Sequence, residues 1–259
     1  SSSSDAVRLP TGRATNALAA ISFVAFLLLI LANRVDDAAI MAGFIPARIG
    51  DPDLLAGMAA VPAWLTPLSC TLVHAGWLHI GFNMLMLVFC GRQVEHVLGW
   101  SCTLALYGVG AYAACLAQWL VDPGSTNPMV GASGAISAII ATYSLLYSQQ
   151  QVRKVGPLSA NLVRVLWLAA GWIAIQLMIG VATAGGLGDL GQIAIAAHIG
   201  GFLAGLALTR PLLRWRPLCS ALPPTSRNCS TATCSCRRKK SRFWIARSRA
   251  KSRRSCSIS

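Results

Sequence analysis

The chain has 259 residues, of which 55% are hydrophobic and 12% are charged. A soluble domain of ordinary composition carries about 25% charged residues, so this composition argues against a soluble enzyme and favours a membrane protein. The formal net charge is +14, but 13 of the 22 Lys and Arg residues lie from Arg214 onward, so the charge belongs to a tail and does not mark a nucleic-acid-binding body.

Six apolar segments follow one another along the chain, and most of them approach the roughly 20 residues that a helix needs to cross a bilayer. Inside lipid the backbone amides must be hydrogen-bonded within the segment, so these segments should be helices. They cover residues 16–32, 65–90, 101–121, 129–147, 162–184 and 190–208. The sequence therefore predicts an all-α polytopic membrane protein with a six-helix bundle over residues 14–213. An N-terminal segment, 1–13, precedes it, and a basic tail, 214–259, follows.

The loops on the two sides of these spans differ in charge. Arg8 and Arg13, Arg92, the loop around Arg153 and the residues from Arg210 onward all fall on one side, whereas the loops on the other side are mainly acidic. The positive-inside rule places the basic side, and with it both termini, in the cytoplasm.

The longest loop on the opposite side runs from Arg34 to Trp64. It holds several apolar side chains among small residues: Leu54, Leu55, Met58, Val61 and Trp64. Such a stretch fits a segment that lies in the membrane interface, and it equally fits an ordinary loop with some buried side chains.

Polar side chains inside spans are costly and usually have a role. The second span carries His79 and Asn83, the fourth carries Ser133 and the sixth carries His198. Counted from the cytoplasmic end of each span, Ser133 lies roughly 22 Å up, His79 roughly 20 Å and His198 roughly 18 Å. Because three helices bring polar groups to nearly the same level, the spacing predicts one shared site.

The fourth span opens with Gly131, Ala132, Ser133 and Gly134, after a loop that contains Pro123, Gly124 and Pro128. A helix start presents free N–H groups and a partial positive charge, which suits a serine nucleophile whose substrate carbonyl becomes an oxyanion. The alternative is that these small residues only permit close helix packing.

The sixth span contains His198 followed by Gly201 and Gly205, a GxxxG pattern that lets two helices approach closely. A neutral imidazole there can take the proton of Ser133 and return it to the leaving amine. No Asp or Glu lies in the outer half of any predicted span. The sequence therefore predicts a Ser–His dyad and no Ser-His-Asp triad, with His79 and Asn83 as oxyanion donors.

His74 lies five residues before His79, so the two would not share a face of one helix, and metal ligation by this pair is not expected. A structural hydrogen bond from His74 to the outer loop is the preferred interpretation. The spans hold Cys70, Cys90, Cys102 and Cys115 as small apolar residues, and the five cysteines of the tail are not expected to form disulfides in the cytoplasm.

Together these residues resemble the rhomboid intramembrane proteases. The resemblance covers roughly residues 14–213 and rests on motifs in spans two, four and six: His74, His79 and Asn83, then Gly131, Ser133 and Gly134, then Ala197, His198, Gly201 and Gly205. It implies the same dyad and the same oxyanion pair, a structural role for the acidic motif at Glu95, and a substrate gate near Phe82, where we also place Trp172.

The resemblance further implies cleavage of single-span membrane proteins in or near their transmembrane segment, with no cofactor and no metal. The plain six-span form resembles bacterial members, which implies the inner membrane. The Trp-Arg pair that many members carry in the first outer loop is absent, and position 137 is Ser where some members have an aromatic residue.

Two other classes of protein are alternatives. A rhomboid-like pseudoprotease would bind membrane proteins without cleavage, but such proteins usually lack the serine or the histidine. A transporter would be expected to show internal repeats or membrane carboxylates. The tail is expected to be disordered; its basic run 237–240 fits anionic lipid headgroups, and no nucleic-acid partner is expected.

Overall fold

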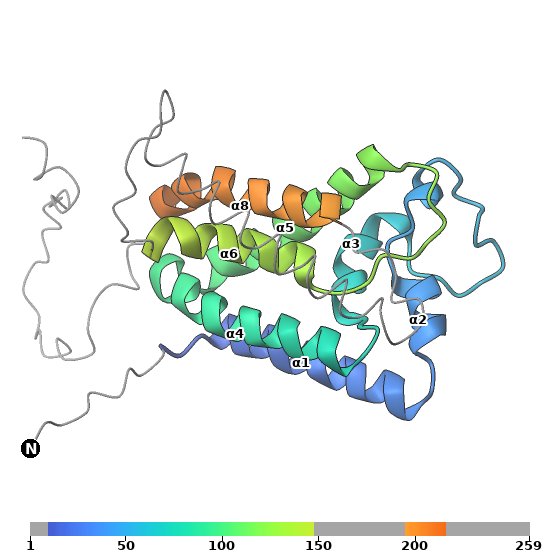
Figure 1. The fold of residues 1–259 in the computed structure, drawn as a ribbon, viewed down its shortest axis with the longest axis horizontal. Helices are drawn as coiled ribbons and strands as arrows, with labels where there is room; N and C mark the ends of the chain where they lie inside the picture. Colours follow the sequence, from blue (N-terminus) through green and yellow to red (C-terminus); the bar gives the residue numbers. More distant parts are fainter. Residues whose placement is uncertain (1–9, 148–194, 216–259) are drawn as a thin grey trace, which may run out of the picture. The chain divides into compact units, whose positions relative to one another are not determined.

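The computed structural model describes residues 10–147 and 195–215. By contacts the chain divides into residues 1–218 and 219–259, and all described residues belong to the first unit. Every regular element in the two described ranges is a helix (Figure 1). In chain order these are α1 (Arg13–Leu31), α2 (Val35–Ala42), η1 (Pro46–Ile49), η2 (Ala63–Leu65), α3 (Thr66–Ser69), η3 (Cys70–Leu72), α4 (Trp77–Leu98), α5 (Trp100–Val121), α6 (Ser133–Tyr147) and α8 (Ile195–Trp215).

Three of these helices, α1, α5 and α8, are long and apolar enough to cross a membrane, with 19, 22 and 21 residues. A fourth span is obtained if α4 is joined to residues 63–72, and α6 is a shorter apolar helix of 15 residues. Apolar side chains stay exposed on the outward faces, as expected where lipid covers a helix; they include Ile21, Leu28, Leu116, Leu120 and Leu203. The predicted all-α membrane bundle is confirmed. The fifth predicted span, 162–184, lies outside the described residues, so the count of six spans stays a prediction.

The second predicted span, 65–90, is wrong at both ends. The helices before and after residues 73–76 meet at an angle of 92°, so this stretch is not one straight helix. The helix α4 then continues for two more turns to Leu98, because Val94 and Leu98 are buried there and Glu95 finds partners on α1. Gly99 ends it with a φ of 86°, which favours glycine. The sixth predicted span also ends too early, since α8 continues from 208 to Trp215.

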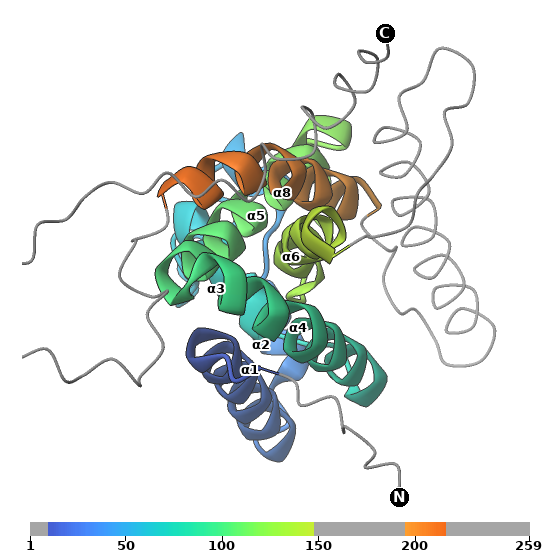
Figure 2. The ribbon, with the colours of Figure 1, turned by 90° about the vertical axis from the view of Figure 1, so that its left-hand side faces the viewer.

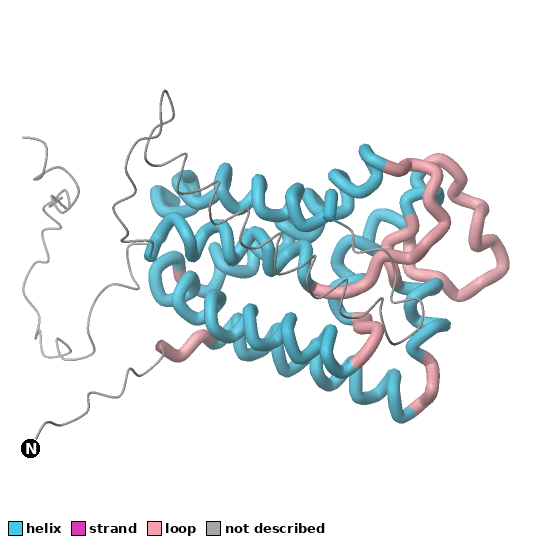
Figure 3. Tube along the Cα trace, viewed as in Figure 1, coloured by secondary structure: helices cyan, strands magenta, loops and turns pink. Residues whose placement is uncertain are grey.

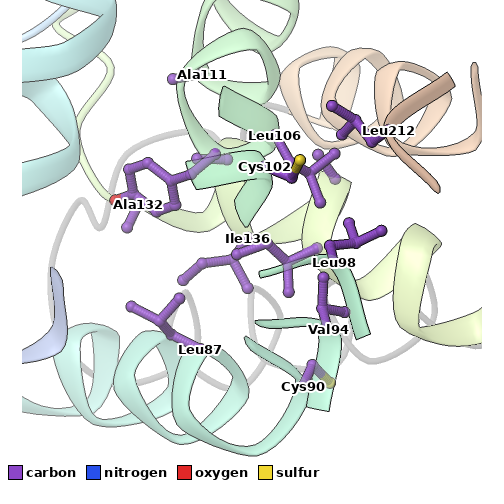
Figure 4. Packing of buried hydrophobic residues seen from close by; sticks show 14 residues of the cluster. Leu87, Cys90, Val94, Leu98, Cys102, Leu106, Ala111, Ala132, Ile136 and Leu212 are labelled. Atoms are coloured by element: carbon purple, nitrogen blue, oxygen red, sulfur yellow. The ribbon is translucent and has the colours of Figure 1, made fainter. Parts of the chain in front are cut away.

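The core lies around α6, which packs against α4, α5 and α8 (Figure 2). Nine of its 15 residues are buried. Figure 4 shows Ile136 of α6 among side chains of α4 and α5, including Leu87, Val94 and Leu106. Since α6 is enclosed by its neighbours, its first residue is held at a fixed place in the bundle.

The two ends of the helical bundle contain different elements and contacts. At the Ser133 end lie the start of α6, the start of α8 and the loops around α2 and α3 (Figure 3). At the Glu95 end, the carboxylate of Glu95 accepts hydrogen bonds from the backbone N–H groups of Ala14 and Thr15 and from the Thr15 hydroxyl, at 2.8 to 3.0 Å. A residue of α4 therefore caps the N-terminus of α1.

Candidate active site

The side chains of Ser133 and His198 meet at the Ser133 end. The Nε2 atom of His198 lies 2.7 Å from the Oγ atom of Ser133, although 65 residues separate them in the chain. His198 is buried, and Ser133 is half-buried. This is the geometry of a hydroxyl hydrogen-bonded to an imidazole that is ready to accept its proton.

Glycines on α8 make this approach possible. A Cβ atom at Gly201 would collide with the carbonyl oxygen of Gly134, and one at Gly205 would collide with the carbonyl oxygen of Ala138. The backbones of α6 and α8 therefore touch along the face that the GxxxG spacing predicts. Because His198 lies one turn before Gly201, the contact carries its ring to the start of α6.

Ser133 is the first residue of α6. The first helical hydrogen bond runs from the Ile136 N–H to the Ala132 carbonyl at 2.9 Å. The N–H groups of Ser133, Gly134 and Ala135 therefore precede the regular helical pattern and have no partner within the helix. They carry the partial positive charge of the helix N-terminus, so an anion formed beside Ser133 would meet N–H donors.

His79 and Gly131 lie against each other next to this helix start. Gly131 has a φ of +107°, and a Cβ atom there would lie 2.5 Å from Nε2 of His79. Its N–H group donates to the Cys70 carbonyl at 2.8 Å. Only glycine fits both the backbone conformation and the close ring, so the His79 imidazole reaches the loop that leads into Ser133.

Asn83 lies one turn after His79 on α4 and is buried. Its Nδ2 atom donates to the His79 carbonyl at 2.9 Å. An amide nitrogen carries two protons, and this bond uses one of them, so the second is left for another acceptor. His79 and Asn83 thus offer side-chain donors on consecutive turns of one helix.

His74 does not make the hydrogen bond to the outer loop that the sequence predicted. Its side chain is 0% exposed, and its Nδ1 atom lies 3.4 Å from the carbonyl of Leu72, two residues away. The ring meets that of His79 edge-on, with centroids 5.2 Å apart. The helix is interrupted at residues 73–76, just before α4. The two histidines are five residues apart, and their rings touch only because they do not lie on one continuous helix.

The structure thus brings Ser133, His198, His79 and Gly131 into one site, with Asn83 adjoining it. Phe82 is exposed on α4, on the outside of the bundle. Trp172, the other predicted gate residue, lies outside the described residues. In the part of the chain that the structure describes, no group of three or more His, Cys, Asp or Glu is placed to hold a metal ion.

Sequence reasoning missed how the loops around the site are held. Phe44 and Met129 form an isolated antiparallel bridge, with hydrogen bonds of 2.8 and 2.9 Å between their backbones. The buried Arg48 donates from Nη2 to the Val61 carbonyl at 3.0 Å. Hydrogen bonds between backbones depend on no particular side chain, so the sequence contains no pattern that predicts this bridge. For the Arg48 contact, the sequence offered only a single Arg among small residues as a signal.

Comparisons with known proteins show the family of the chain. Residues 62–215 match the family model described as the Rhomboid domain. The chain is 30% identical over 147 residues to RHOMBOID-like protein 5 of Arabidopsis thaliana, a match that covers 56% of the chain and 43% of that protein. It is 28% identical over 145 residues to Rhomboid-type serine protease 2 of Emericella nidulans, covering 55% of the chain and 25% of that protein.

A third relative is Rhomboid protein 1, mitochondrial, of Saccharomyces cerevisiae, 29% identical over 138 residues that cover 51% of the chain and 37% of that protein. The chain therefore spans less than half the length of these relatives. They come from a plant and from fungi, so the bacterial type that the six-span form suggests stays a prediction.

Proposed function

The chain belongs to the rhomboid family, and from this premise we propose that it is an intramembrane serine endopeptidase that uses Ser133 as nucleophile and His198 as base. The observation that carries the proposal is the 2.7 Å contact between Ser133 Oγ and His198 Nε2 at the N-terminus of α6. The name of a relative, a rhomboid-type serine protease, supports the same class of enzyme.

The reaction begins when the substrate carbonyl carbon comes within reach of Ser133 Oγ. The oxygen attacks this carbon while His198 Nε2 takes the hydroxyl proton, and a tetrahedral oxyanion forms. His198 then gives the proton to the departing amine, which leaves as one half of the cut chain. Water attacks the remaining ester by the same route, releases the new carboxyl group and restores Ser133.

The oxyanion would be stabilised by donors that are already in place. These are the free N–H groups at the start of α6, the second amide proton of Asn83 and an N–H of His79. One donor of this kind lowers the barrier by about 2.7–4 kcal/mol. These donors should stabilise the oxyanion strongly, because His198 and Asn83 are buried and water screens charge poorly in a buried site.

The catalytic pair acts without a carboxylate. Glu95 is the one acidic residue within α4, α5, α6 and α8. It is held at the opposite end of the bundle by Ala14 and Thr15. His198 is instead oriented by the packing of α8 against α6, and no cofactor or metal enters the proposed reaction.

The substrate would be a single-span membrane protein that reaches the site from the lipid. We place its entry beside Phe82, on the exposed side of α4, with Trp172 as a second gate residue. The α6 helix is only 15 residues long, about 22 Å against a hydrocarbon core of about 30 Å. Ser133 therefore lies below the membrane surface, and water reaches it through the loops at that end. We place both termini in the cytoplasm and the protein in a bacterial inner membrane.

The test is cleavage of a model single-span substrate by the purified full chain in liposomes. Ser133→Ala and His198→Ala should each lower the cleavage rate by at least about 1,000-fold, because residues of one catalytic unit fail together. Ser144→Ala, the same change near the other end of α6, should cut like the wild type. Equal cleavage by Ser133→Ala would refute the proposal. If the wild type binds the substrate but never cuts it, a pseudoprotease is the better description.

A further inference from the structure

Two free thiols, Cys70 and Cys115, are buried together at the Ser133 end. Each side chain is 2% exposed, and the two belong to one small apolar cluster with Phe44, covered by Trp119 and Met129. Cys70 lies in η3 and Cys115 in α5, so the pair joins two elements that are 45 positions apart in the chain.

The two thiols pack in one cluster of three buried side chains, Phe44, Cys70 and Cys115. The Cys70 thiol donates a hydrogen bond to the Pro67 carbonyl at 3.4 Å. A disulfide needs a bond of about 2.05 Å between sulfurs whose Cα atoms are about 4.4–6.8 Å apart. Because the two thiols lie in one buried cluster on two packed elements, a shift of η3 against α5 would bring them to that geometry.

The pair lies directly beneath the loop that enters the site. The carbonyl of Cys70 accepts the hydrogen bond from the Gly131 N–H, two residues before Ser133. Phe44, which covers the thiols, is bridged to Met129 of the same loop. A covalent link between η3 and α5 would therefore fix the support on which the Ser133 loop rests.

We propose that Cys70 and Cys115 form a reversible disulfide that fastens η3 to α5 beneath the Ser133 loop. The reaction is an exchange with a disulfide of small size, such as oxidised glutathione. Its S–S bond breaks, the Cys70–Cys115 bond forms, and the two protein thiol hydrogens leave on two molecules of reduced glutathione. The loop charges predict that this end faces away from the cytoplasm, where disulfides persist.

Burial sets the condition for this reaction. Thiols that are 2% exposed are inert until their cover opens. The cover includes the loop residues Phe44 and Met129, whose bridge of two hydrogen bonds has far fewer bonds than a helix. Oxidation should therefore proceed when the loop opens, well below the temperature at which the bundle unfolds.

The experiment uses the full chain in detergent with the five tail cysteines changed to Ser: Cys219, Cys229, Cys234, Cys236 and Cys256. After incubation with oxidised glutathione, peptide mass mapping should find Cys70 joined to Cys115 with the loss of two hydrogens, and dithiothreitol should reverse it. A link that closes a loop of about 45 residues should raise the midpoint of thermal unfolding by about 5–10 °C.

The controls lie in the same chain. Cys90 and Cys102 are also buried and free, but along the antiparallel pair α4 and α5 they differ in level by about 9 Å, so they should not be joined. Cys115→Ala should abolish the rise of the midpoint. The inference is overturned if no disulfide joins Cys70 to Cys115, if glutathione stays attached to single cysteines, or if the link forms and leaves the midpoint unchanged. These readouts do not depend on proteolysis.

Discussion

The two ends of the helical bundle are held together by different means. At the Ser133 end, helices meet through glycines and loops meet through a few backbone hydrogen bonds. At the Glu95 end, a buried carboxylate accepts three hydrogen bonds from the first turn of α1. The difference teaches that close packing sets the geometry of the site, whereas polar side chains at the far end secure the bundle. Substitutions at the two ends should therefore separate activity from stability.

Apart from the catalytic pair, the largest effect is expected for Asn83→Ala. Removing one oxyanion donor should lower the rate of peptide cleavage by about 100- to 1,000-fold. The midpoint of thermal unfolding should change little, because the Asn83 side chain donates to a carbonyl of its own helix and, within the described residues, bridges no second element. Cleavage assays and thermal unfolding on the same preparation measure both quantities. A variant that loses stability in proportion to activity would contradict the proposed division between the two ends.

Gly201→Ala should have the next largest effect. The added methyl group would collide with the Gly134 carbonyl and push α8 away from α6. A displacement of about 1 Å between catalytic groups costs on the order of 100-fold in rate. The matched control is Gly108→Ala, where a Cβ atom meets nothing within 4 Å. Equal activity of Gly201→Ala and the control would show that the helix contact does not position His198.

Glu95→Gln should act on stability and leave the chemistry intact. The change removes a negative charge from the N-terminus of α1 and leaves one donor there facing another. The free energy of unfolding should fall by about 2 kcal/mol, which lowers the unfolding midpoint by roughly 4–8 °C. Cleavage well below that temperature should match the wild type. The control is Asp122→Asn, since Asp122 is exposed and caps no helix start in the described residues. This change should shift the unfolding midpoint by less than the error of its measurement.

The smallest effect is expected for Thr142→Val. The Thr142 hydroxyl lies 2.9 Å from that of Thr209, and both are buried between α6 and α8. Losing this bond should cost about 1 kcal/mol of stability. Because Thr209 is then left without that partner, the double variant Thr142→Val/Thr209→Val should cost less than the sum of the single ones. Strict additivity of the three midpoints would show that the two hydroxyls do not interact.

The sequence predicted the all-α membrane bundle and the meeting of Ser133 with His198. Ser133 and His198 stand out because polar groups in apolar spans are rare, and the rise per residue brings them to one level. The GxxxG spacing on α8 likewise predicts the close helix contact, since only side-chain size is involved.

What the sequence did not show depends on partners far away in the chain. The break at residues 73–76 lies inside a stretch that the sequence predicted to be one span, and it explains why the His74 and His79 rings touch. The predicted second span ends before the end of α4, because Glu95 resembles a polar loop residue until α1 is placed beside it.

The cap that Glu95 places on α1 also has a consequence for biosynthesis. The acceptor lies 80 residues after Thr15, so at about 5–20 residues per second it is made about 4–16 s later. During that interval the first turn of α1 has only water and lipid headgroups for its N–H groups. The nascent α1 is therefore free to change its depth in the membrane. That depth becomes fixed only when α4, which carries Glu95, has been inserted.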